Sequence, residues 1–399
     1  MKFVAFIAAI IAMATESVTV ATKSVLGATA PGLAAGVTGG GSAIPVYPTT
    51  IAELKFYLND TIPRVIILNK AIDFRGSENT TTETGCQPDY TRKCIALNNG
   101  FLSQNVILQS GGMNNTGGCT NGEPISVTYD IAGAKKPLVV SSNKTLRGEG
   151  LKGVIIGKGL WLNGDNIIIQ NIHITNLNPQ YVWGGDAFYL QGVNNRAMKK
   201  IWIDHVKVSL VGRQMFTTNA AGVESLTISN SEFDGQTTWS ATCDGNHYWS
   251  LIFYGNVKMS FVNNLVHHTS GRSPKMSGST VFAHIANNHW FNNSGHSFEG
   301  SEGAFTLSEG NYFEQTVLPN LVDKTANVMS TSNANKVSCT STLKRSCVPD
   351  VFVSSGVFNN TNESNVVSNM NGVATAYKPK AAAKLKKSTK NFGVGNLFL

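Results

Sequence analysis

Charged side chains are scarce in this sequence, since Asp, Glu, Lys and Arg make up only 14% of its 399 residues. Long apolar stretches are also missing from its interior, so no internal segment is a candidate for a membrane span. What the chain has instead is 39 glycines and a large share of Asn, Ser and Thr. This composition favours a turn-rich, strand-rich protein over a helical one.

Closely spaced cysteine pairs are absent as well, because no C-x-x-C occurs, and this argues against a zinc site.

The N-terminus has Lys2, an apolar run and Ala12-Met13-Ala14, a pattern typical of a signal peptide over residues 1–20. We therefore expect a secreted, extracellular protein. In an oxidising compartment the six cysteines favour disulfides, with 15 possible pairings. Sequons at Asn59, Asn79, Asn143 and Asn292 predict a glycoprotein.

Two hydrolytic arrangements are not found. No Asp-Asp pair occurs and the acidic residues are scattered, which argues against a glycoside hydrolase with paired carboxylates. No G-x-S-x-G elbow is present to support a serine esterase, although Asp204-His205 occurs. His267-His268 is a weak hint of a metal site, and a surface position explains it equally well.

Positive charge is in excess, with a net charge of +8 and a pI near 9.1. Much of it lies in a basic tail, residues 377–399, which contains six lysines between Lys378 and Lys390. For a secreted protein we expect contact with an acidic polysaccharide rather than with nucleic acid or a membrane. The simplest interpretation of the tail itself is a solvated helix or a disordered arm.

A repeat runs through the middle of the chain. An Asn or His follows a short alternating strand six times, in steps of 34, 25, 34, 24 and 23 residues, at Asn171, His205, Asn230, Asn264, Asn288 and Asn311. A period in the twenties without helical patterning predicts a parallel β-helix in which these side chains stack as a ladder at one corner. Residues 21–376 are expected to form it. A T-x-x-E capping box at Thr50 predicts a short N-terminal capping helix.

The two long steps predict loops that grow from one face and form a cleft. Two Gly-Arg pairs, at Arg213 and Arg272, each lie eight residues after a repeat position, in rounds two steps apart. With a strand spacing of about 4.8 Å, their Cα atoms are expected on the order of 10 Å apart. Trp239 falls at nearly the same phase in the round between them. Two cations with an aromatic side chain between them suit an anionic or sugar ligand.

Five motifs in this order resemble the fungal and oomycete pectin lyases of the pectate lyase superfamily: VWGGDA (182–187), WIDH (202–205), VGRQ (211–214), ATCDGNHYW (241–249) and SGRSPK (270–275). The resemblance extends from about Gly36 to Phe313. It implies a single-stranded right-handed parallel β-helix and an endo-acting enzyme that cleaves methyl-esterified galacturonan by β-elimination, giving 4,5-unsaturated products. A role in degradation of the plant cell wall, as a virulence factor, and a monomeric state are part of the same expectation.

The resemblance also implies site residues. Arg272 is the expected base for the proton α to the ester, and Lys275 the stabiliser of charge on the ester carbonyl, while Asp186 and Arg213 complete the catalytic set. Trp183, Trp239, Trp249, His247 and Tyr248 are expected to contact sugars. Trp161 and Trp202 fall in strand patterns and are expected in the core.

A guanidinium is a difficult base, because it normally keeps its proton above pH 12. Arg272 can accept one only where burial and neighbouring cations disfavour its charge; the alternative is an electrostatic role with water or hydroxide as the base. No metal and no cofactor are expected. The proton beside a neutral ester is more acidic than one beside a carboxylate, and Arg213 falls in the region where calcium would need carboxylates.

The family suggests the disulfides Cys86–Cys119, Cys94–Cys243 and Cys339–Cys347. This sequence departs from the family between Cys86 and Cys119, where it has none of the tryptophans that line the cleft in many members. Two alternatives stay open. One is a calcium-dependent pectate lyase, and the other a non-catalytic pectin-binding protein of the cell wall.

Overall fold

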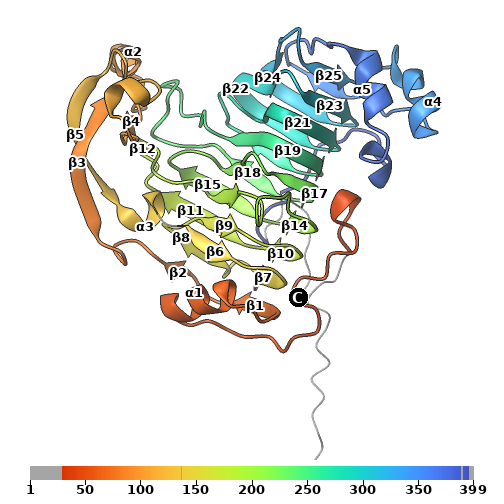
Figure 1. Ribbon diagram of the computed structural model, residues 1–399. Helices are drawn as coiled ribbons and strands as arrows, with labels where there is room; N and C mark the ends of the chain where they lie inside the picture. Colours follow the sequence, from red (N-terminus) through yellow and green to blue (C-terminus); the bar gives the residue numbers. More distant parts are fainter. Residues whose placement is uncertain (1–28, 136, 388–389, 395–399) are drawn as a thin grey trace, which may run out of the picture.

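The chain winds into a parallel β-helix that carries a wall of loops along one side (Figure 1). The computed structural model describes residues 29–135, 137–387 and 390–394, so the predicted signal peptide lies outside the described residues. One sheet of 22 strands forms the β-helix and one of four strands belongs to the wall. All strand pairs named within the large sheet are parallel. The predicted right-handed parallel β-helix is confirmed.

Three faces run along the β-helix. The front face contains β6 (Leu138–Val140), β9 (Leu160–Leu162), β13 (Phe188–Leu190), β16 (Phe216–Thr218) and the first residues of β19 (Leu251–Val262) and β21 (Lys275–Ala286). The second face contains β1 (Arg64–Leu68), β7 (Lys144–Gly148), β10 (Ile167–Gln170), β14 (Ile201–Asp204), β17 (Val223–Ser229), the later part of β19 and β21, β23 (Ala304–Glu309) and β25 (Asn327–Ser330).

The third face completes each round. It contains β2 (Ile72–Asp73), β8 (Val154–Ile156), β11 (His173–Leu177), β15 (Lys207–Val211), β18 (Glu232–Asp234), β20 (Leu265–His267), β22 (His289–Gly300), β24 (Tyr312–Leu321) and β26 (Val351–Val353). Apolar side chains are register partners of apolar side chains in successive rounds. An example is the buried column Ile169, Ile203, Ile228, Phe261 and Ile285. Such columns bury the apolar side chains and leave strand edges open only at the two ends.

At the corner between the second and third faces, the predicted ladder was wrong by one residue in part of the chain. Asn171, His205 and Asn230 adopt left-handed φ values of 54°, 49° and 51°, and the residues equivalent to them in later rounds are Asn263 and Asn287, at 57° each. The buried ladder is the next position along, where the Nδ2 groups of Asn264 and Asn288 each donate to the following Oδ1 at 3.0 Å. The predicted alignment therefore joined two different positions. Asn suits both, because it tolerates the left-handed region and also pairs with itself along a stack.

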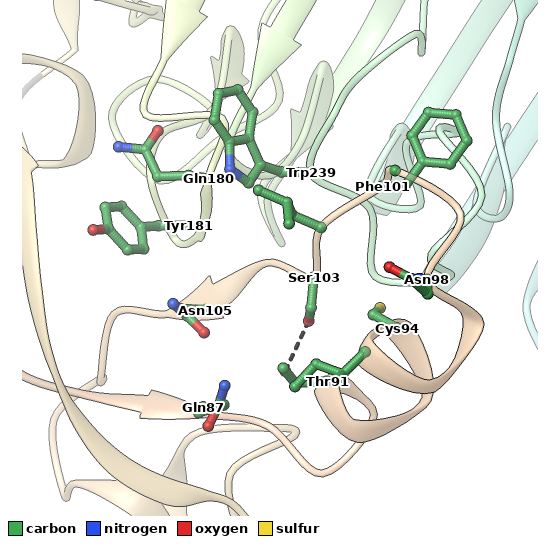
Figure 2. Close-up of a pocket in the computed structure, with 13 residues that line it drawn as sticks. Gln87, Thr91, Cys94, Asn98, Phe101, Ser103, Asn105, Gln180, Tyr181 and Trp239 are labelled. Carbon is green, nitrogen blue, oxygen red and sulfur yellow. Dashed lines mark hydrogen bonds between the residues drawn. The ribbon is translucent and has the colours of Figure 1, made fainter.

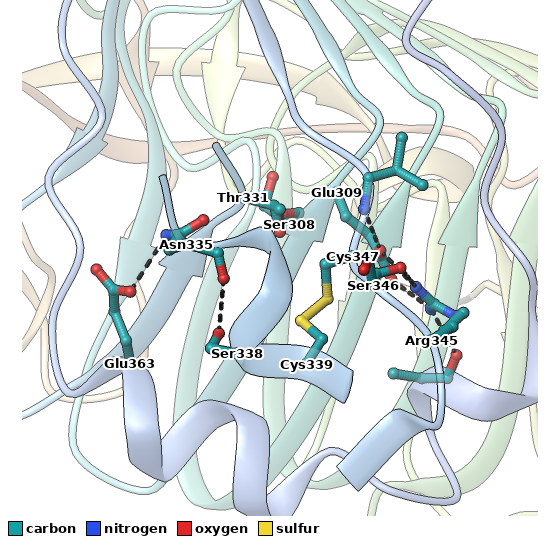
Figure 3. Close-up of a disulfide and its surroundings, with 12 residues drawn as sticks. Ser308, Glu309, Thr331, Asn335, Ser338, Cys339, Arg345, Ser346, Cys347 and Glu363 are labelled. Atoms are coloured by element: carbon teal, nitrogen blue, oxygen red, sulfur yellow. Dashed lines mark hydrogen bonds and ion pairs between the residues drawn. A yellow bond between two sulfur atoms is a disulfide. The ribbon is translucent and has the colours of Figure 1, made fainter. Parts of the chain in front are cut away.

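Both ends of the β-helix are covered. At the N-terminal end, α1 (Ile51–Asn59) has the predicted capping box of Thr50 and Glu53 and buries Leu54 and Leu58 in the core. At the other end, η3 (Lys336–Cys339), α4 (Thr340–Leu343) and α5 (Glu363–Asn369) pack around the Cys339–Cys347 disulfide (Figure 3). Beside that disulfide the Arg345 guanidinium donates two hydrogen bonds to the buried Glu309 carboxylate, at 2.6 and 2.8 Å. Short 3-10 turns η1 (Gly32–Ala34), η2 (Met113–Asn115) and η4 (Ala374–Ala376) complete the set of described helices.

The wall rises beside the front face. It consists of β3 (Thr80–Gln87), β4 (Asn105–Val106), β5 (Glu123–Asp130) and β12 (Tyr181–Val182), with α2 (Thr91–Leu97) and α3 (Ile131–Ala134) (Figure 1). Its disulfides join Cys86 to Cys119 and Cys94 to Cys243, so all three predicted pairings are confirmed. The second ties the wall to a loop of the β-helix 149 residues away in sequence.

The described part of the basic tail lies against the corner of the β-helix and is neither a helix nor a detached arm. Lys380 exchanges backbone hydrogen bonds with the Asn287 side chain, and the Phe392 and Val394 N–H groups donate to Asn171 Oδ1 and to the Asn230 carbonyl. The left-handed corner residues therefore supply the binding sites for this segment. Across the described residues, no helix has the length and apolar character needed to span a bilayer.

Candidate active site

Two Gly-Arg pairs hold cations beside the wall, and in each pair glycine is required by close approach. A Cβ on Gly212 would lie 2.5 Å from the Tyr181 carbonyl oxygen, and one on Gly271 would lie 2.5 Å from the Tyr248 ring. The following arginines rest on aromatic rings. The Arg213 Cζ atom is 3.3 Å from the Trp183 ring centroid, and the predicted proximity of the two arginines is reflected in the effect of Arg272 on the pKa of Arg213.

Arg272 is fixed by its backbone and its neighbours. Its φ of 47° lies in the left-handed region, its carbonyl accepts from the Leu251 N–H at 2.6 Å, and its Cζ lies 4.8 Å from the Trp249 ring centroid. Its buried Nε has no hydrogen-bond partner, and no described carboxylate forms an ion pair with its guanidinium. The cation is therefore oriented by packing and remains available to a ligand.

Arg213 and Asp186 form a loose charge pair next to Arg272. Burial lowers the pKa of Arg213 to about 10; Asp186 opposes that shift and Arg272 adds to it. Burial likewise raises the pKa of Asp186, against the opposing effects of Arg213 and of the Gln214 N–H, which donates to Asp186 Oδ1 at 2.8 Å. Asp186 acts on Arg213, and Arg272 adds a second positive charge beside it, so the site carries excess positive charge.

Lys275 lies at the start of β21, three residues beyond Arg272, and its ammonium pairs with Glu299 on β22. The His296 Nε2 atom lies 3.2 Å from the other oxygen of the same carboxylate. Burial raises the pKa of Glu299, but the hydrogen bonds from His296 and Lys275 outweigh it and hold that pKa at about 2. The carboxylate is ionised over the physiological range and keeps the Lys275 ammonium in place.

Sequence reasoning missed Glu299 and His296. A signal was present, because Glu299 follows Lys275 by 24 residues, one repeat step, and the two are register partners. Gln104 in the wall was also missed; its amide donates to the carbonyls of Pro179 and Gly212, and its oxygen accepts from Trp249 Nε1 at 3.1 Å. Its position inside a long loop gives no sequence signal.

Three of the five predicted sugar contacts lie beside the arginines. Trp183 and Trp249 are half-buried beneath Arg213 and Arg272, and Tyr248 packs edge-on against Trp249 with centroids 4.9 Å apart. His247 is placed differently. It is only 2% exposed, and its Nε2 contacts the carbonyls of Arg213 and Trp249 at 2.7 and 3.1 Å, so it supports the loop from below and offers no surface to a sugar.

Trp239 lines a cavity of about 600 Å³ with Tyr181, Phe101 and residues of α2 (Figure 2). The described cation–ring contacts of the two arginines join Arg213 to Trp183 and Arg272 to Trp249 and Tyr248, and none of them includes Trp239. Trp202 is buried as expected, whereas Trp161 is only half-buried.

A group of potential metal ligands lies on the third face and not in the cleft. Glu232, Asp234 and His267 are close enough together to share an ion. The Lys387 ammonium lies 2.6 Å from Glu232 and the Lys207 ammonium 2.8 Å from Asp234, so two lysines already neutralise these carboxylates. The arrangement is that of a buried ion-pair network.

A right-handed β-helix with the cations Arg213, Arg272 and Lys275 and the rings of Trp183 and Trp249 beside its wall has the features of a polysaccharide lyase of the pectin-degrading class. A sequence profile described as Pectate lyase matches residues 105–390. Probable pectin lyase F of Aspergillus niger is 46% identical over 371 residues, which cover 92% of this chain and 74% of the relative. Pectin lyase B of Emericella nidulans is 44% identical, covering 83% and 84% of the two chains. The chain therefore belongs to the pectate lyase family, and its resemblance to pectin lyases is confirmed.

Solved structures agree on the fold. A pectate lyase from Bacillus sp. N165, solved in complex with trigalacturonate, superimposes with a TM-score of 0.52 over 88% of this chain and 94% of its own, at 16% identity. The cedar pollen allergen Jun a 1 gives a TM-score of 0.50 over 84% of both chains, at 17% identity.

Proposed function

We propose that this pectin lyase cleaves methyl-esterified galacturonan within the chain by β-elimination and without a metal ion. The observation that carries the proposal is the Arg272 guanidinium, which is oriented by aromatic packing and has no carboxylate partner among the described residues. Arg272 places positive charge where the reaction develops negative charge, so the proposed elimination does not require a metal ion for that purpose.

Each cation can be assigned to one step of the elimination. Removal of the proton on C5 leaves its electron pair, which forms the C4–C5 double bond as the bond from C4 to the glycosidic oxygen breaks; the leaving oxygen then takes a proton. We assign Arg272 to the C5 proton, either as the base or as the cation that holds a hydroxide there. Lys275, fixed by Glu299, stabilises the negative charge that develops on the ester carbonyl. Asp186 and Arg213 complete the proposed catalytic set beside Arg272.

The residues present do not fit calcium. Calcium prefers several carboxylate oxygens, and here Asp186 is paired with Arg213 while Glu299 is engaged by Lys275 and His296. A divalent cation between Arg213 and Arg272 would meet two like charges. The elimination therefore proceeds with the protein's own cations.

The expected setting completes the proposal. We assign residues 1–20 to a cleaved signal peptide and 21–376 to the lyase domain of a secreted, glycosylated monomer that acts on plant cell walls. The three disulfides support an oxidising compartment.

Analysis of the reaction products tests this function. Purified protein is incubated with highly methylated pectin, and both ultraviolet absorbance and new reducing ends are measured. A lyase gives the two signals in equal molar amounts, because every cut creates one double bond. Reducing ends without absorbance would indicate hydrolysis, and binding without either signal would indicate a pectin-binding protein.

A further inference from the structure

Outward-facing side chains of the front face form a continuous row that passes through Lys275. The register partners along it are Trp161, Tyr189, Thr217, Ile252 and Lys275. In β9 and β13 the flanking residues point into the core, whereas Trp161 and Tyr189 point outward and are half-buried. The row therefore leads from the proposed site to an aromatic pair toward the N-terminal end.

Trp161 and Tyr189 border a cavity of about 250 Å³. Their ring centroids are 6.1 Å apart with an interplanar angle of 53°, and the Tyr189 hydroxyl accepts a hydrogen bond from Asn219 Nδ2 at 2.7 Å. The other described residues that line it are Gly133, Ala134, Pro137 and Asp186. Asp186 also belongs to the proposed catalytic set, so the cavity and that set have one residue in common.

We propose that Trp161 and Tyr189 form a remote subsite that binds methyl-esterified galacturonosyl residues of the substrate chain; this inference rests on the proposed function. Trp161 lies four strand spacings from Lys275, about 19 Å along the row. One sugar unit advances a galacturonan chain by a distance similar to one strand spacing, so the subsite holds sugars roughly three to four units from the cleaved bond.

The chemistry of the cavity fits this occupant. The C–H face of a pyranose packs against aromatic rings, and the small side chains of Gly133 and Ala134 leave the rings accessible. Of the described residues that line the cavity, only Asp186 carries a charge, and a carboxylate disfavours the approach of a second carboxylate. A sugar with a methyl ester therefore fits better than a sugar acid.

Binding to oligomers of two lengths tests the subsite. Methyl-esterified oligogalacturonates of ten and of three sugars are titrated calorimetrically in an Arg272→Ala background, which prevents turnover. We expect Trp161→Ala to weaken binding of the decamer about tenfold and to leave the trimer, which spans only the cleavage site, within twofold. Trp161→Phe keeps an aromatic ring and should stay within threefold. Demethylated decamer should show a smaller dependence on Trp161.

The matched control is Phe56→Ala, which removes an aromatic ring that is 59% exposed on α1 and should change neither affinity. An equal loss for both oligomers, or no loss for the decamer, would overturn the inference. The product analysis of the wild-type protein is kept separate. If pectin yields no unsaturated product while Trp161→Ala still weakens only the decamer, the proposed function is wrong and the subsite stands.

Discussion

Two clusters of charged side chains lie on different faces of the same β-helix and are balanced in opposite ways. On the third face, Lys207 and Lys387 contact Glu232 and Asp234, and every cation of this group touches a carboxylate. Beside the wall, Asp186 lies close enough to Arg213 to affect its charge, and Arg272 has no described ion-pair partner. The first cluster is complete without a ligand, whereas the second has positive charge to spare.

The difference separates stability from function. A buried carboxylate with satisfied partners holds rounds together, and removing one partner leaves an uncompensated charge in the interior. An oriented cation without a partner contributes little to folding but can stabilise negative charge that appears during a reaction. We therefore expect substitutions in the two clusters to have opposite consequences, on unfolding in one and on turnover in the other.

The largest effect is expected from Arg272→Ala. Loss of the unpaired cation should lower kcat on methylated pectin by about 10³-fold or more, because it removes charge stabilisation and proton transfer together. The melting temperature should stay within about 2 °C of wild type. Initial rates from ultraviolet absorbance and a thermal melt measure both. Arg75→Ala, which removes an exposed arginine paired with Asp73, is the control. Full turnover by Arg272→Ala would refute the assignment.

Glu232→Ala should have the converse effect. It removes the buried carboxylate that Lys207, His267 and Lys387 contact and leaves Asp234 to Lys207 and His267, so the free energy of unfolding should fall by about 3 kcal/mol. The kcat should remain within twofold. Urea unfolding provides the measurement. The control is Glu224→Ala, in an exposed pair with Lys199, which should lower the free energy of unfolding by less than about 1 kcal/mol. An equal loss in the two variants would show that the third-face cluster stabilises the protein no more than an exposed ion pair does.

Acid should weaken the third-face cluster by a smaller, graded amount. Burial raises the pKa of Glu232, but the hydrogen bond from His267 and the charges of Lys207 and Lys387 hold it at about 2. A carboxyl whose folded pKa lies below its unfolded value stabilises the protein above about pH 4.5, and this contribution is lost as the pH falls toward 2. The slope of unfolding free energy against pH should be shallower in Glu232→Gln than in wild type between these values; identical slopes would contradict the account.

The smallest effect is expected from Lys387→Ala. This lysine joins the tail to Glu232, but its side chain is 52% exposed, so solvent and salt screen the pair. We expect a loss of less than about 1 kcal/mol in urea unfolding, and a smaller one at high salt. A loss as large as that of Glu232→Ala would show that the ion pair with the tail lysine accounts for most of the stability that the cluster contributes.

Repetition explains how much of this could be predicted from the sequence. The steps of 23 to 25 residues predicted the β-helix, and the two Gly-Arg pairs shared a phase; in the structure Arg272 lies close enough to Arg213 to affect its charge. The ladder was misplaced by one residue because Asn serves at both Asn230 and Asn264 for different reasons. Positions inside the insertions were less predictable, since a loop carries no period.

The direction in which a side chain points was the other feature that the sequence did not predict. His247 belongs to a family motif, and only the structure shows that it faces two carbonyls below the loop. Trp161 matched a strand pattern and was expected in the core, but its neighbours Leu160 and Leu162 take the inward positions. In a three-residue strand, alternation fixes which residues share a face and leaves open which face is buried.

The most direct test of the unpaired-cation account is the rate of unsaturated product formation from one galacturonan prepared in two forms, highly methylated with a chelator present and fully demethylated with calcium present. The account predicts absorbance from the methylated form in chelator and essentially none from the demethylated form in calcium. The reverse result would show a calcium-dependent pectate lyase and would contradict the role given to Arg213 and Arg272.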